Sequence, residues 1–65
     1  MTVIVTMADK LGCAERELAL RERAYPKFVE QKKLSAGRAE LEIEIMRAIV
    51  KDYQRAVRNT LAQEE

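Results

Sequence analysis

The stretch RAYPKFVEQKKLSAG, residues 23–37, decides the fold of this 65-residue chain. It contains the only proline, Pro26, which lacks a backbone N–H and disfavours a straight helix by about 3 kcal/mol. Phe28 nevertheless continues the apolar pattern that precedes the proline, and KFVEQKK is good helix-forming sequence. We therefore expect a helix that kinks at Pro26 and continues to Lys33, rather than one that stops at Tyr25.

The first helix is predicted over residues 7–33. Thr6 and Asp9 have the spacing of a capping box, in which each side chain accepts a hydrogen bond from the backbone N–H of the other residue. After them, apolar residues recur at steps of three and four, with Arg21 as the one polar interruption. This spacing is typical of one face of an amphipathic helix. The apolar series is Met7, Leu11, Ala14, Leu18, Tyr25 and Phe28.

The second helix is predicted over residues 36–62. Ser35 is suited to cap its start, and Gly37 is a poor helix former close to that start. Two long helices joined by a tight turn form an antiparallel hairpin. The expected fold is therefore all-α, as a single small domain over residues 1–65. An apolar seam at four-three spacing runs along this second helix: Ala39, Ile43, Met46, Val50, Tyr53, Val57 and Leu61.

The core of such a hairpin is thin, because each helix covers only one side of the other. Counting outward from the turn places Leu18 near Val50, and Leu11 near Val57. The second helix also carries apolar residues that point away from this seam, and an exposed apolar patch on a small protein usually marks an interface. We expect it to be the self-interface of a homodimer that forms a four-helix bundle, although a different protein is the competing partner. The predicted self-interface residues are Leu41, Ile45 and Ile49.

A second surface of the same helix is basic. Four cationic residues line a stripe of about 80° at helical spacing. Such a stripe suits an acidic protein partner or a phosphate backbone. Basic residues near a helix C-terminus also simply favour the helix dipole and solubility. A net charge of only +1 makes nucleic acid the less favoured partner. The predicted partner-binding residues are Arg47, Lys51, Arg55 and Arg58.

Residues 2–5, TVIV, are apolar, mostly β-branched and uncharged. One possibility is that they extend the first seam, because Ile4 stands three residues before Met7. The other is an extended arm within residues 1–6 that adds to the strand edge of another chain.

Composition excludes several classes of site. The chain has no histidine, so no Ser/His or Cys/His pair exists, and Cys13 is the only cysteine, so an internal disulfide and a Cys/His zinc site are excluded. A glycine-rich phosphate loop is absent from the sequence. We expect no enzyme activity, no cofactor and no metal. Without a signal peptide or a long apolar stretch, we expect a cytoplasmic protein with no membrane partner.

The run ELALRERAYPKFVEQKKLSAGRAELEIEIMRAIVKDY, residues 17–53, contains an ELAxRxRxYP block, a basic loop with Ser35, and AxxEIxxMxAIxxDY over Ala39–Tyr53. In these features the chain resembles short helical proteins encoded by bacteriophages and prophages. The resemblance implies a viral accessory protein in the cytoplasm of a bacterial host, and it transfers no site residues.

The expected function is inhibition of a bacterial defence complex, such as an immune effector or a nuclease, by binding rather than by catalysis. The setting comes from the resemblance, and the binding mode follows from the absent chemistry and the surplus apolar surface. One alternative is a small nucleic-acid-binding regulator that uses the basic stripe. Another is a component of virion assembly.

Overall fold

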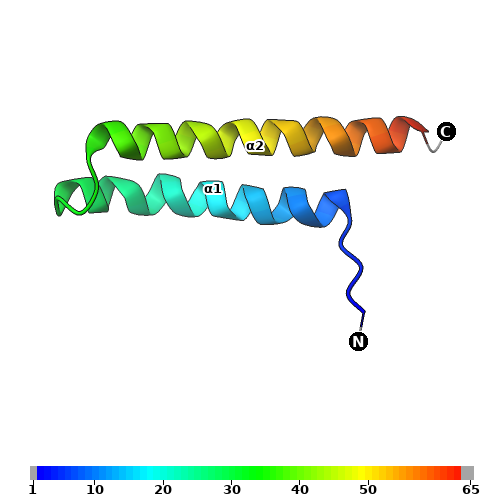
Figure 1. Cartoon of the computed structure of the whole chain (residues 1–65), viewed down its shortest axis with the longest axis horizontal. Coiled ribbons are helices and arrows are strands. Elements are labelled where there is room, and N and C mark those ends of the chain that lie inside the picture. The colour runs from blue at the N-terminus through cyan, green and yellow to red at the C-terminus, as the bar shows by residue number, and fades with distance from the viewer. Residues whose placement is uncertain (1, 64–65) are drawn as a thin grey trace.

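The computed structural model describes residues 2–63, with side chains described through Leu61, and consists of two antiparallel helices joined by a short turn (Figure 1). The first helix, α1, spans Met7–Glu30, and the second, α2, spans Ala36–Gln63. No strand occurs within residues 2–63. The all-α helical hairpin expected from the sequence is confirmed.

The start of α1 is fixed by the predicted capping box. The Thr6 N–H donates to Oδ2 of Asp9, and the Asp9 N–H donates to Oγ1 of Thr6, both at 3.0 Å. These bonds satisfy backbone donors that the first turn of a helix leaves without a partner. The bond from the Thr6 N–H, together with its hydroxyl, lowers the pKa of Asp9.

Helix α1 continues through Pro26 to Glu30 and does not stop at Tyr25. Pro26 offers no N–H to the carbonyl of Glu22, which is four residues earlier. The kink at Pro26 stays a prediction.

The end of α1 differs from the predicted end at Lys33 by three residues. Lys32 has a φ of 60°, in the left-handed region, and this turns the chain out of the helix. The Lys32 N–H donates to the Val29 carbonyl at 3.0 Å, and the Lys33 N–H donates to the Phe28 carbonyl at 2.9 Å. These two hydrogen bonds, in which the later residue donates to the earlier carbonyl, form the Schellman motif, which satisfies carbonyls at a helix C-terminus. The prediction was wrong here because a lysine carries no sequence signal for a left-handed position.

Helix α2 begins where the sequence predicts. The Arg38 N–H donates to Oγ of Ser35 at 3.1 Å, and the Ala39 N–H donates to the Ser35 carbonyl at 2.9 Å. Ser35 is therefore the residue that caps α2, and the connection between the helices is only five residues long, 31–35.

The core lies along the shared side of the two helices and is thin. Its buried cluster is Ala14 on α1 with Met46 and Val50 on α2, and Ala39 is buried nearer the turn. Among the described side chains none is completely removed from solvent. The partly buried residues packed against this cluster are Leu11, Leu18, Ile49 and Tyr53.

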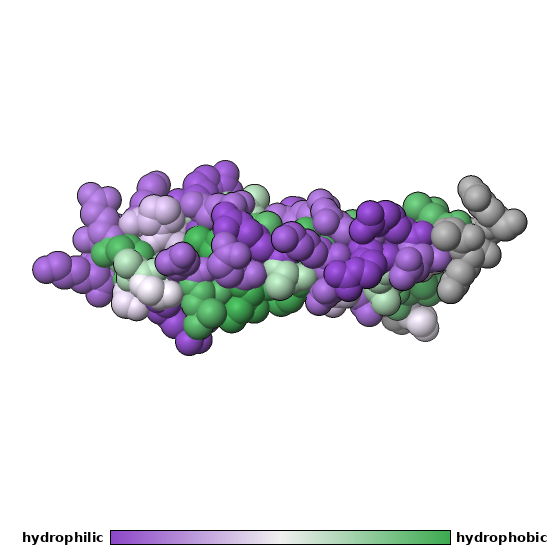
Figure 2. Space-filling view, turned by 90° about the horizontal axis from the view of Figure 1, so that it is seen from above, coloured by the Kyte–Doolittle hydropathy of each residue, from purple (hydrophilic) through white to green (hydrophobic). Residues whose placement is uncertain are grey.

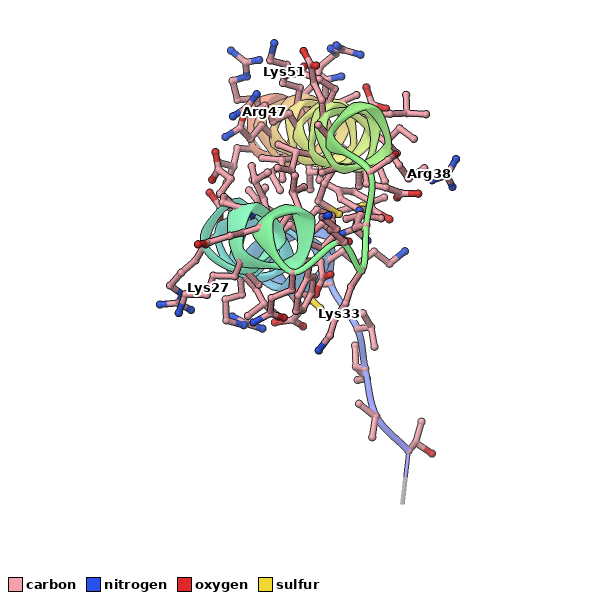
Figure 3. The ribbon with its side chains drawn as sticks, turned by 90° about the vertical axis from the view of Figure 1, so that its left-hand side faces the viewer. Lys27, Lys33, Arg38, Arg47 and Lys51 are labelled. Atoms are coloured by element: carbon pink, nitrogen blue, oxygen red, sulfur yellow. The ribbon has the colours of Figure 1, made fainter. Side chains whose placement is uncertain are left out.

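Residues 2–5 form an extended arm that leads away from the hairpin (Figures 1 and 3). Val3, Ile4 and Val5 are all exposed, so Ile4 does not extend the apolar seam. Met1 of the predicted arm lies outside the described residues.

Replacing Lys32 with glycine tests the end of α1. Lys32→Gly is expected to raise the free energy of unfolding by roughly 0.5–1 kcal/mol, because glycine adopts a positive φ without a Cβ clash. The control is Lys33→Gly, which is expected to lower the stability, since Lys32 is the only described non-glycine residue with positive φ. Urea unfolding followed by circular dichroism at one protein concentration measures both, and equal effects would contradict the assignment.

The capping box also predicts a pH dependence. Asp9 has a lower pKa when folded than when unfolded, so its stabilisation is complete above the unfolded value near pH 4. The stabilisation is lost as pH falls through the folded pKa. Between pH 6 and pH 3, the melting temperature of the wild type should therefore fall further than that of Asp9→Asn. A parallel fall of the two proteins would show that the Asp9 carboxylate does not stabilise α1.

Candidate interaction surfaces

The hairpin has two different sides. Figure 3 looks along the helices from the turn and places Arg47 and Lys51 on one side of α2 and Arg38 on the other. We call the first the basic side, defined by Arg47, Lys51 and Arg58. We call the second the groove side, defined by the residues that line an open groove there: Lys10, Cys13, Ala14, Glu17, Met46, Ile49 and Tyr53.

On the basic side, Arg47 links the two helices. Its Nη2 donates to Oε2 of Glu22 on α1 at 2.9 Å, and its Nη1 donates to Glu44 on its own helix. The bond to Glu22, followed by the bond to Glu44, raises the pKa of Arg47. Arg47 therefore contributes to the hairpin itself and offers less charge to a partner than the sequence indicates.

The other residues of the predicted stripe divide into two groups. Arg55 lies 3.6 Å from Asp52, an i,i+3 pair on the exposed surface of α2. Lys51 and Arg58 have no ion-pair partner within the described part of the chain. Arg58 also lines a shallow groove of about 390 Å³, in which Leu11 and Val57 supply the apolar surface and Gln54 is the remaining lining residue.

The groove on the groove side is lined by seven residues, and most of its surface is apolar. Its volume is about 360 Å³. Ala14 and Met46 form part of its floor and belong to the core cluster. Cys13 is an exposed free cysteine on its α1 wall. The sequence reasoning missed this groove, because residues of α1 and α2 come together there only once the register is known.

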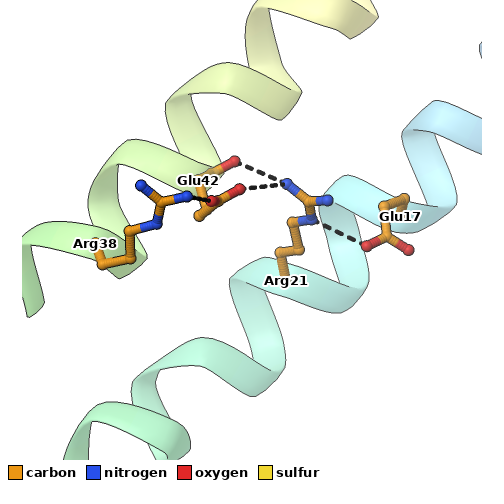
Figure 4. A network of polar contacts seen from close by, with 4 residues as sticks. All are labelled: Glu17, Arg21, Arg38 and Glu42. Atoms are coloured by element: carbon orange, nitrogen blue, oxygen red, sulfur yellow. Dashed lines mark hydrogen bonds and ion pairs between the residues drawn. The ribbon is translucent and has the colours of Figure 1, made fainter. Parts of the chain in front are cut away.

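Arg21 occupies the groove side nearer the turn and joins the two helices (Figure 4). Its Nε donates to Oε1 of Glu17 at 2.9 Å, and its Nη1 donates to the backbone carbonyl of Glu42 at 3.0 Å and to Oε2 of Glu42 at 3.5 Å. Nη2 of Arg38 pairs with Oε1 of Glu42 at 2.6 Å. The bond to Glu17 is the main cause that raises the pKa of Arg21. The polar interruption of the α1 seam is thus an interhelical contact.

The predicted self-interface residues lie partly on the surface. Leu41 is 49% exposed and Ile45 is 43% exposed, whereas Ile49 is half-buried against the core cluster and lines the groove. Figure 2 shows an apolar area along one edge of the outer face of α2, in the half nearer the turn. Ile49 therefore connects the groove with the exposed apolar surface of α2.

In comparisons with known proteins, no family model, no curated protein and no solved structure matches the chain. Within residues 2–63, no helix is both long and apolar enough to cross a bilayer. The same residues contain no group of three or more side chains able to hold a metal ion together.

Removing the Arg21 side chain tests the interhelical contact. Arg21→Ala should lower the free energy of unfolding by about 1–3 kcal/mol, because Arg21 is only 22% exposed and its bonds to Glu42 are charge-assisted. Arg38→Ala is the control, since Arg38 contacts the same carboxylate but is 59% exposed. Its cost should stay below about 0.5 kcal/mol. Chemical unfolding that gives similar losses for both variants would rule out a special role for Arg21.

Proposed function

We propose that this protein is a phage-encoded inhibitor of a bacterial defence complex, such as an immune effector or a nuclease, and that it acts in the host cytoplasm. Its mode of action is binding rather than catalysis. The observation that carries the binding mode is the basic side of α2, where exposed Arg58 lines the groove formed by Leu11 and Val57 and Lys51 is exposed seven residues, or two helical turns, before it. The resemblance to phage proteins supplies the setting.

The basic side suits an acidic protein segment that also carries an apolar side chain. Such a segment would place carboxylates at Lys51 and Arg58 and its apolar residue against Leu11 and Val57. In such an interface the apolar groove buries the apolar side chain of the partner, and the flanking charges fix the orientation of the bound segment.

Nucleic acid is the less favoured partner. Two of the four stripe residues, Arg47 and Arg55, already lie in ion pairs within the chain. The net charge of +1 supplies little long-range attraction for a polyanion. A small nucleic-acid-binding regulator remains the alternative function, and a virion assembly component is the other.

We further propose that the protein is a homodimer in which two hairpins form a four-helix bundle through Leu41, Ile45 and Ile49. The thin core supports this, because a chain of this size buries little apolar surface on its own. The exposed Leu41 and Ile45 supply the additional apolar surface for a second copy.

Charge reversal on the basic side tests the proposed inhibition. Bacterial strains that each carry one defence system are challenged with a phage which that system restricts, while expressing the protein. The wild type is expected to restore plaque formation on at least one strain. Lys51→Glu combined with Arg58→Glu should reduce that restoration at least about tenfold, since repulsion replaces attraction at two contacts.

The matched control reverses two cations on the outer face of α1, Arg16→Glu with Arg23→Glu. Both are exposed, and neither has an ion pair within the described residues. This control should inhibit as well as the wild type. Failure of the wild type on every nuclease and immune-effector strain would contradict the proposal. Binding of duplex DNA that weakens steeply with added salt would instead favour the nucleic-acid alternative.

A further inference from the structure

We propose that two copies of the chain pack through their groove sides, with α1 antiparallel to the partner's α1 and a two-fold axis over Cys13 and Ile49. In this arrangement Lys10 of each copy pairs with Glu17 of the partner subunit. The inference rests on the self-association proposed above and specifies its face, its direction and its register; it keeps Ile45 and Ile49 in the contact and leaves Leu41, which is about 80° from Ile49 around α2, outside it.

The charges on the rim of the groove carry the argument. Lys10 and Glu17 both line it, and they are seven residues, or about 10.5 Å, apart along α1. Glu17 accepts from Arg21 through Oε1, so Oε2 is the atom assigned to the partner's Lys10. Cys13 and Ala14 lie midway between them. A two-fold interface brings the same patch of both copies together, so it is favourable only when the patch complements itself. An axis at the midpoint reverses α1 and puts each lysine opposite the partner's Glu17.

The same axis matches the residues of α2. Ile45 and Tyr53 are each four residues from Ile49, which lies at the centre of the groove wall. Ile49 would contact its own equivalent, and Ile45 would pack on the partner's Tyr53. Ile45 is one of the large apolar residues that the isolated hairpin leaves exposed. Contact between an aliphatic side chain and an aromatic ring would therefore bury surface that has no cover in the monomer.

The charged pair on α1 and the apolar pairs on α2 thus agree on one axis, which favours a second copy over a foreign protein as the occupant of the groove.

Light scattering on the full chain tests the association itself. The wild type should have about twice the chain mass of 7.5 kDa. Ile45→Glu should give a monomer with unchanged helix content, because the new carboxylate is buried only in the dimer. A wild-type monomer at high micromolar concentration would overturn both the self-association and the present arrangement.

A charge swap tests the register. Lys10→Glu and Glu17→Lys, made singly, place like charges together and should each weaken dimerisation about tenfold or more. The double variant restores opposite charges across the axis and should dimerise like the wild type. Circular dichroism checks that Glu17→Lys still folds, since Glu17 also bonds Arg21. No recovery in the double variant would overturn the register.

Crosslinking tests the direction of the helices. A short bifunctional thiol reagent should link the two copies of Cys13, which lie near the axis. Moving the thiol to the turn, with Cys13→Ala and Lys33→Cys, should abolish the link, because the two turns lie at opposite ends of the proposed dimer. A dimer that links through Lys33→Cys and not through Cys13 would refute this arrangement while leaving self-association intact.

Discussion

The packing of Ala14 against Met46 and Val50 is the contact on which the rest of this structure depends. Ala14 lies in the first half of α1 and is small, and the larger side chains Leu11, Leu18, Ile49 and Tyr53 pack around its contact with α2. Since two helices cover only one side of each other, Ala39 is the one further apolar side chain that is buried among those the structure describes, and the rest stay at least partly exposed. The surfaces that suggest a function are therefore a direct consequence of building a domain from a single hairpin.

Two arginines secure the hairpin at its edges, one on each side of the core. Arg21 bonds Glu42 on the groove side, and Arg47 bonds Glu22 on the basic side. Both contacts join the two helices in the same register, and the half-exposed pair of Arg47 with Glu22 contributes less than the bonds of Arg21, since exposed ion pairs add at most about 1 kcal/mol. The interhelical role of Arg47, with the pair of Arg55 and Asp52, explains why the basic stripe has less free charge than its composition indicates, and Lys51 and Arg58 are its residues without an ion pair in the described part of the chain.

The sequence predicts those features that depend on near neighbours. The capping box at Thr6, the cap at Ser35 and the seam through Met46 and Val50 are all confirmed. Prediction from the sequence fails where a feature depends on a residue far along the chain, or on a residue type that carries no signal for the conformation it adopts. Lys32 gives no sign of its left-handed backbone, which ends α1 early. The groove and the bond from Arg21 to α2 can be predicted only when the alignment of α1 against α2 is known. Counting outward from the turn gives this alignment only to within a few residues.

The two sides of the hairpin allow self-association and partner binding to occur together. In the proposed dimer the groove sides face inward, so the basic sides, which lie across α2 from Arg38, face outward on opposite surfaces of the bundle. Each dimer then offers two equivalent sets of Lys51 and Arg58. A target with repeated subunits would engage both sets, and the second contact would form at a high effective concentration. A chain too small for a large interface would in this way hold a large assembly through two modest ones.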